Sequence, residues 1–99
     1  MPRPPALTAA ELDRFLGASP DWTLEDARLV RRATAASFPA AIEWVVAVAD
    51  AAERADHHPD IDIRWRTVTF RLSTHDAGAV TVLDVSLARA IDEIVHDAP

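Results

Sequence analysis

Apolar residues recur at helical spacing near the start of the chain. Thr8 and Glu11 have the spacing of a capping box, in which each side chain bonds the other residue's backbone N–H at the first turn of a helix. The apolar residues that follow share one helical face: Leu12, Phe15 and Leu16. Glycine commonly ends helices. The pattern therefore predicts an amphipathic helix from Thr8 to about Leu16, ended by Gly17.

A longer helical segment follows two short runs with strand character. We expect short strands at Asp21–Leu24 and Leu29–Thr34, around an acidic turn. Ser37 and Pro39 suit the cap and first turn of a helix, which we expect to continue to about Asp56. Its apolar residues cover more than one stripe: Ile42, Trp44, Val45, Val46, Val48 and Ala49. Because a surface helix needs only one apolar face, the excess predicts a further partner, such as another subunit.

Two segments in the second half of the chain alternate between apolar and polar residues. The apolar positions are Ile61, Ile63 and Trp65 in the first segment and Val68, Phe70 and Leu72 in the second. Each segment is predicted to be a strand with one buried face, and a tight turn near Arg66 joins them. Residues 73–79 are expected to form a loop. Thr81 and Asp84 then have the spacing of a second capping box, which predicts a last helix.

The resulting order of elements is α-β-β-α-β-β-α. This order predicts an α+β fold in which an antiparallel sheet carries helices on one face. At 99 residues the chain is large enough for a single domain with its own core. Only the proline-rich residues 1–6 are expected to be frayed.

Composition narrows the classes of function. The formal net charge of −6 argues against nucleic acid as the main ligand, because phosphate binding needs a basic face. The absence of cysteine excludes disulfides, thiolate metal sites and cysteine nucleophiles. The start of the chain has no apolar signal core, and the longest apolar run, Trp44–Ala49, is too short to span a bilayer. These features predict a soluble, cytoplasmic protein with no membrane partner.

The candidate chemistry lies around two adjacent histidines, His57 and His58, which precede Pro59. Proline disfavours the helical conformation at the residue before it, so His58 should lie just beyond the long helix and His57 at its end. Glu53 lies one helical turn before His57, on the same face. If the two alternating strands form a hairpin, His75 emerges at the same end of the sheet as the histidine pair. Three imidazoles beside a carboxylate suit acid–base chemistry near neutral pH.

Simpler interpretations exist for each of these residues. A histidine at a helix C-terminus is often only a favourable partner for the helix dipole. Three histidines and a glutamate could also bind zinc, although adjacent histidines rarely reach one ion. Asp84 has a sufficient explanation as a capping carboxylate, and Trp22 as a core or hairpin residue. His96, near the end of the chain, is expected on the surface.

The combined spacing resembles the signature of the pterin-4a-carbinolamine dehydratases, also called 4a-hydroxytetrahydrobiopterin dehydratases. The pattern is Glu53-x3-His57-His58-Pro59-x5-Trp65-x9-His75-x8-Asp84. The resemblance extends to LSTHDAG at 72–78, to TVLDVSLA at 81–88 and to Trp22. It covers nearly the whole chain and implies a four-stranded antiparallel sheet with three helices packed on one face. The implied reaction removes water from a 4a-hydroxytetrahydropterin and gives quinonoid dihydropterin, without a metal or another cofactor.

The resemblance also implies roles for individual residues. Those that it makes catalytic are His57, His58 and His75. Those that it places against the pterin are Asp56, Ser73, Thr74, Asp76 and Trp22. Glu53 and Asp84 are implied to orient the imidazoles. The family further implies a homodimer or homotetramer and a functional link to an aromatic amino acid hydroxylase.

A non-catalytic scaffold of the same fold is the alternative function. Animal relatives act as dimerisation cofactors for a homeodomain transcription factor, and some bacterial relatives assist assembly of a carbon-fixing enzyme. A pure scaffold has no need of three histidines, so their presence favours the enzyme.

Overall fold

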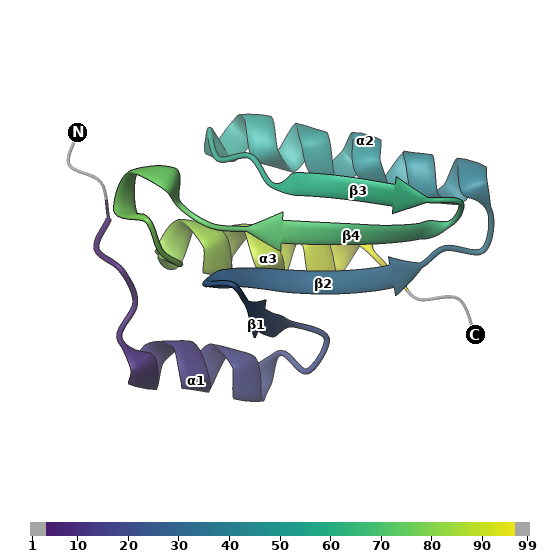
Figure 1. The fold of residues 1–99 in the computed structure, drawn as a ribbon. Coiled ribbons are helices and arrows are strands. Elements are labelled where there is room, and N and C mark those ends of the chain that lie inside the picture. Colours follow the sequence, from purple (N-terminus) through teal and green to yellow (C-terminus); the bar gives the residue numbers. More distant parts are fainter. Residues whose placement is uncertain (1–3, 97–99) are drawn as a thin grey trace.

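The computed structural model describes residues 4–96, which form three helices and one four-stranded antiparallel sheet (Figure 1). In chain order the elements are α1 (Ala9–Ala18), β1 (Thr23–Glu25), β2 (Arg28–Thr34), α2 (Phe38–Ala55), β3 (Asp60–Arg64), β4 (Thr67–Leu72) and α3 (Val82–Ile94). A 3₁₀ turn, His75–Ala77, lies between β4 and α3. This order confirms the predicted α+β fold. Of the residues expected to be frayed, 1–3 lie outside the described part of the chain.

Both predicted capping boxes are present at the starts of α1 and α3. The Thr8 hydroxyl accepts the Glu11 N–H, while the Glu11 carboxylate accepts the Thr8 N–H. These bonds hold the pKa of Glu11 below its ordinary value, chiefly through the bond from the Thr8 backbone. The prediction that Gly17 ends α1 is wrong, because α1 continues to Ala18 and the capping residue is Ser19, whose N–H bonds the Leu16 carbonyl.

The strands lie in the order β1-β2-β4-β3, and every neighbouring pair is antiparallel. β1 lies further along the chain than the expected Asp21–Leu24, because Trp22 is still in the turn after α1, where its N–H bonds the Ser19 carbonyl. Asp26 and Ala27 join β1 to β2 as a two-residue turn, and both have positive φ. This turn type fits the twist of the flanking strands.

The expectation that Trp65 faces the core is wrong. Strand β3 ends at Arg64, and Trp65 lies in the tight turn that leads to β4, with φ of 56°. The left-handed backbone at this position takes the side chain out of the strand's alternation, and the indole is 89% exposed. Ile61 and Ile63, by contrast, pack against the core from β3 as predicted.

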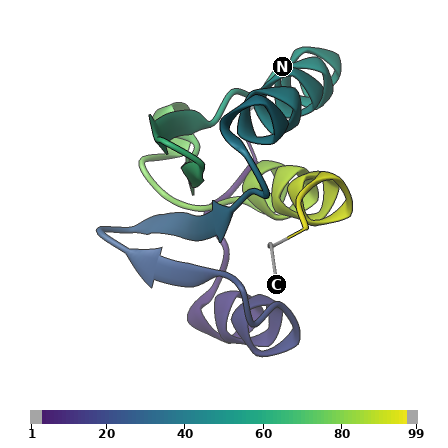
Figure 2. The same ribbon diagram turned by 90° about the vertical axis from the view of Figure 1, so that its right-hand side faces the viewer.

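All three helices lie on one side of the sheet, as Figure 2 shows with the strands seen nearly end-on. The core forms between these two layers. Its sheet side consists of the alternate residues Leu29, Ala33, Val68, Phe70 and Leu72, and its helix side includes Phe15, Val48, Leu87, Ala88 and Ile91. Burying a side chain such as Phe70 completely stabilises the fold by roughly 1.5–3 kcal/mol.

The long helix α2 has more apolar surface than the sheet covers, as its sequence pattern predicts. Val48 is fully buried and Trp44 and Val45 pack against the core, whereas Phe38, Ile42 and Val46 are 56%, 38% and 61% exposed. These three residues follow each other at four-residue spacing, so they form one stripe along the outer face of α2. Within residues 4–96, no helix has both the length and the apolar content needed to cross a membrane.

Candidate active site

The end of α2 turns sharply, and this turn places the two adjacent histidines. Asp56, the residue after the helix, has a left-handed backbone with φ of 50°. Its N–H and the N–H of His57 bond carbonyls in the last turn of α2. His57 and His58 therefore lie beyond the helix, in the connection to β3. The prediction that His57 lies at the end of the helix is wrong, because α2 ends two residues earlier, at Ala55.

The loop after β4 approaches the same end of the sheet. Because β3 and β4 are antiparallel, the start of β3 and the end of β4 lie side by side. Thr74 then bridges to Ala79, and this pairing closes the short loop that contains His75. Gly78 takes the positive φ that ends the 3₁₀ turn, a conformation that glycine adopts without a steric penalty.

A cavity of about 830 Å³ opens where these two loops meet. The lining residues are Pro4, Ala55, Asp56, His57, His58, Pro59, Asp60, Ser73, Thr74, His75, Asp76 and Leu83. The structure therefore brings the three candidate catalytic histidines together with four of the five residues expected to contact a substrate. Three aspartates line the cavity, and among residues 4–96 none of its lining residues is an arginine.

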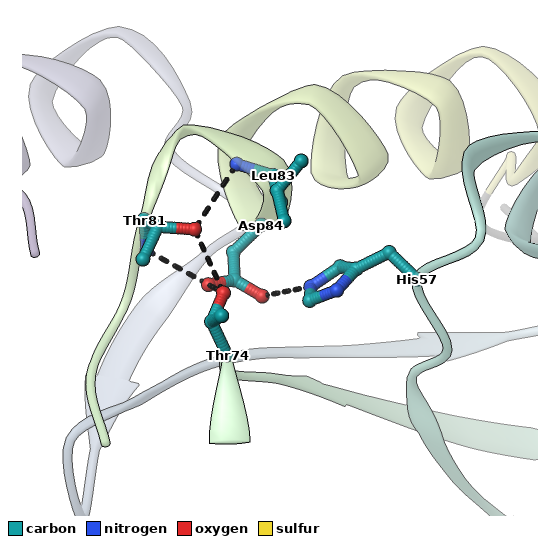
Figure 3. A network of polar contacts seen from close by, with 5 residues as sticks. All are labelled: His57, Thr74, Thr81, Leu83 and Asp84. Atoms are coloured by element: carbon teal, nitrogen blue, oxygen red, sulfur yellow. Dashed lines mark hydrogen bonds and ion pairs between the residues drawn. The ribbon is translucent and has the colours of Figure 1, made fainter. Parts of the chain in front are cut away.

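His57 is held by a buried carboxylate (Figure 3). Its Nε2 lies 2.6 Å from Oδ1 of Asp84, which is fully buried, while the His57 side chain is 11% exposed. An ionised carboxylate can only accept hydrogen bonds, so the ring donates through Nε2–H. Its Nδ1 makes no hydrogen bond to another residue in the described part of the chain and remains available to a bound molecule. Asp84 also completes the capping box of α3, as its position predicts, because its carboxylate accepts the N–H of the N-cap residue Thr81.

His58 has a different partner and a more open setting. Its Nε2 lies 2.7 Å from Oε1 of Glu53, and both side chains are mainly exposed, at 57% and 77%. Glu53 therefore pairs with His58 and not with His57, which the helical spacing had placed on its face. The difference arises because the chain leaves the helix at Asp56, beyond which the four-residue spacing no longer applies.

His75 is the least restrained of the three histidines. It is the first residue of the 3₁₀ turn and is exposed, and its ring makes no hydrogen bond to any residue between positions 4 and 96. The three imidazoles thus share one cavity but differ in their support: one is fixed by a buried aspartate, one by an exposed glutamate, and one by its backbone alone.

The structure does not bring Trp22 to the cavity. The indole is 3% exposed in the core, and its Nε1 donates to Oδ1 of Asp92 on α3 at 2.8 Å. The same carboxylate pairs with Arg31 of β2, which is itself 4% exposed. Trp22 is therefore held in a polar cluster that ties the turn between α1 and β1 to β2 and α3, in agreement with its simpler interpretation as a core residue.

Several lining residues were not singled out from the sequence. Ala55 and Asp60 flank the His57-His58-Pro59 segment, so their neighbourhood in the chain could have indicated them. Pro4 and Leu83 come from distant segments, and no local pattern distinguishes them. His96 is exposed, as expected. Among the residues that the structure describes, no three His, Asp or Glu side chains are grouped so that they could hold one metal ion.

The chain matches known proteins over nearly its whole length. A profile of the family described as pterin 4 alpha carbinolamine dehydratase matches residues 5–94. A Nocardia farcinica protein, provisionally named as such a dehydratase, is 64% identical over 77 residues, which make up 78% of this chain and 81% of that protein. A Chloroflexus aurantiacus protein with the same provisional name is 53% identical over 91 residues, covering 92% and 98% of the two chains.

Solved structures give the same result for the fold. A Brucella melitensis protein described as a transcriptional coactivator/pterin dehydratase superposes with a TM-score of 0.88 at 30% identity, covering 92% of this chain and 99% of that one. A pterin dehydratase-like protein described as a RuBisCO assembly factor in the alpha-carboxysome superposes with a TM-score of 0.63 at 17% identity, over 78% and 89% of the chains. The profile match and the close relatives together show that this chain belongs to the pterin-4a-carbinolamine dehydratase family.

Proposed function

We propose that this protein removes water from 4a-hydroxytetrahydropterins and so regenerates quinonoid dihydropterin. The observation that carries the proposal is the meeting of His57, His58 and His75 in one cavity large enough for a bicyclic ring. Family membership supports the same reaction class.

The reaction needs one acid, which acts at the hydroxyl on C4a, and one base, which acts at the neighbouring N5–H. The C4a–O bond breaks while an acid protonates the departing hydroxyl, which leaves as water. A base takes the N5 proton, and the electrons of the N5–H bond form the C4a–N5 double bond. Protons pass between the cavity and solvent to restore the acid and the base. The reaction only removes water, so no electron donor or acceptor is consumed.

His57 is the best-placed base. Its Nε2–H bond to Asp84 leaves Nδ1 as the basic nitrogen of the neutral ring, and the buried carboxylate stabilises the imidazolium that forms when Nδ1 takes a proton. The exposed histidines, His58 and His75, are the candidates for the acid, because they exchange protons readily with solvent. Each positioned group of this kind contributes typically about 10²–10⁴-fold to the rate.

The proposal extends to the setting of the reaction. The mechanism uses side chains alone, so we expect it to proceed without a metal or redox cofactor. The exposed stripe of Phe38, Ile42 and Val46 supports a homodimer or homotetramer. A cytoplasmic role beside an aromatic amino acid hydroxylase, which would supply the hydroxylated pterin, fits the same reaction.

A stopped-flow assay tests the proposal directly. The dehydration of a 4a-hydroxytetrahydropterin is followed with and without purified protein, before and after exhaustive treatment with EDTA. We expect acceleration that survives the chelator. If the activity disappears and added zinc restores it, the metal-free mechanism is wrong; if the protein never accelerates dehydration, the enzyme proposal fails.

The exposed stripe on α2 also favours the second candidate, a scaffold that assembles other proteins. This candidate would be preferred if folded protein left the spontaneous dehydration rate unchanged. Its own test is Ile42→Glu, which should abolish the assembly of those other proteins while the variant itself still folds.

A further inference from the structure

Asp84 belongs to a polar network that extends beyond its bond to His57. Figure 3 shows its carboxylate between the His57 ring and the side chains of Thr74 and Thr81. Oδ2 of Asp84 lies 2.8 Å from the Thr74 hydroxyl and 2.8 Å from the Thr81 backbone nitrogen. The two hydroxyls lie 2.7 Å apart. Thr81 and Asp84 are fully buried and Thr74 is 6% exposed, so these groups satisfy each other.

Each hydroxyl can donate only one proton, and this determines the direction of every hydrogen bond in the network. The Thr74 proton goes to Asp84, which can only accept when ionised. The contact between the hydroxyls must then use the Thr81 proton, so Thr81 donates to Thr74. The Thr81 oxygen in turn accepts the Leu83 N–H at 3.2 Å. As a result Thr74 has no proton left for a substrate, although it lines the cavity.

The network determines which oxygen of Asp84 faces which donor. Two donors, the Thr74 hydroxyl and the Thr81 N–H, converge on Oδ2. Oδ1 is therefore turned toward Nε2 of His57 as the site of a third donor. We propose that Thr74 is a positioning residue: with the Thr81 backbone it fixes the rotation of the Asp84 carboxylate, so that Oδ1 keeps its bond to His57 and the ring is held as the Nε2–H tautomer.

This inference rests on the proposed function only where it makes His57 the base. The selected tautomer leaves Nδ1 unprotonated, which a base requires. The tautomer itself can be measured without substrate, from the ¹⁵N chemical shifts of the His57 ring. A result on the tautomer therefore stands even if the dehydration assay fails.

The first test compares Thr74→Val, which keeps the shape of the side chain but removes the hydroxyl, with Thr74→Ser, which keeps the hydroxyl. In the unaltered protein we expect neutral His57 to be the Nε2–H tautomer. Thr74→Val should give a mixture of tautomers and lower kcat by about 10-fold at unchanged KM, because a supporting hydrogen bond to the orienting carboxylate is lost. Thr74→Ser should restore both the tautomer and the rate.

A second variant keeps the test decisive if Thr74→Val does not fold. In Asp84→Asn, the two donors at the Oδ2 position should hold the amide oxygen there and turn the amide NH₂ toward His57. Nε2 must then accept, so neutral His57 should change to the Nδ1–H tautomer. Comparison with His57→Gln assigns the His57 signals.

Three results would overturn the proposal. One is an Asp84→Asn protein in which His57 keeps the Nε2–H tautomer. Another is a folded Thr74→Val protein with the tautomer and kcat of the unaltered protein. The third is a rise in KM at unchanged kcat in Thr74→Val, which would make Thr74 a substrate contact instead.

Discussion

Replacing His57 should affect both stability and rate, whereas replacing His58 or His75 should affect mainly the rate. The His57 ring donates to a fully buried carboxylate. Removing a hydrogen bond to a buried charged group costs about 1.5–3 kcal/mol, so His57→Ala should lower the free energy of unfolding by roughly 2 kcal/mol. In a domain of this size that corresponds to a fall in Tm of about 10 °C.

The other two histidines provide the comparison. The pair between His58 and Glu53 is exposed, and exposed ion pairs contribute only about 0–1 kcal/mol. His75 has no side-chain hydrogen bond within residues 4–96. His58→Ala and His75→Ala should therefore change Tm by only a few degrees. Each of the three alanine variants should nevertheless slow dehydration by about 10²-fold or more if the group takes part in proton transfer.

His57→Gln separates the two effects of His57. The glutamine amide can reach the Asp84 oxygen and donate to it, but it has no basic nitrogen. We expect this variant to be nearly as stable as the unaltered protein and to be as slow as His57→Ala. His96→Ala, on the exposed end of the chain, is the control and should change neither quantity. The measurements are stopped-flow dehydration rates and thermal unfolding followed by circular dichroism. A His57→Gln protein with a normal rate would refute the assignment of the base, and a His57→Ala protein with an unchanged Tm would refute the stability argument.

Other predictions concern the outer face of α2, the charge of the cavity and the sheet surface. Val46→Glu should shift light scattering toward a monomer of about 10.8 kDa, because it places a charge in the exposed apolar stripe; an unchanged oligomer would place the interface elsewhere. Three aspartates and, within residues 4–96, no arginine line the cavity, so a substrate with an anionic side chain should show a higher KM than a neutral one at low salt. Asp60→Asn should narrow the difference between the two KM values; equal KM values in the unaltered protein would contradict this. The hydrogen bond from Arg32, helped by Thr23, lowers the pKa of Glu25 to about 2. The stability that Glu25 contributes is therefore present above about pH 4.5 and lost as the pH falls through about 2. Glu25→Gln and the unaltered protein should differ in Tm at pH 5, and their Tm values should converge near pH 2. A Tm difference that persists at pH 2 would contradict this.

Elements whose signals are local could be predicted from the sequence. Both capping boxes and the core-facing positions of Val68, Phe70 and Leu72 on β4 are confirmed, because the physical cause of each lies within a few residues. The excess of apolar residues on α2 is confirmed for the same reason: helical spacing alone shows that one sheet cannot cover them all. The convergence of the three histidines also followed from a simple rule, that the two ends of an antiparallel hairpin meet.

Features that depend on a single backbone conformation or on a distant partner could not be predicted. Trp65 continues the alternation of its strand in sequence, but one residue with positive φ takes it into the turn. The hydrogen bond of Trp22 is to Asp92, 70 positions away, and nothing near Trp22 indicates that partner. The sequence thus placed Trp65 in the core, where the structure does not have it, and for Trp22 only the simpler interpretation as a core residue agrees with the structure.

The partners of the two adjacent histidines show where the physical argument from spacing ends. A four-residue spacing brings side chains together only while the backbone remains helical. Asp56 leaves that conformation, so Glu53 meets the exposed His58, and His57 turns toward α3. There it meets a carboxylate whose presence the capping box already explained. A capping aspartate receives the backbone N–H on one oxygen and has a second oxygen that the helix does not use. At Asp84 that second oxygen binds the candidate base, so the start of α3 both begins a helix and orients the site.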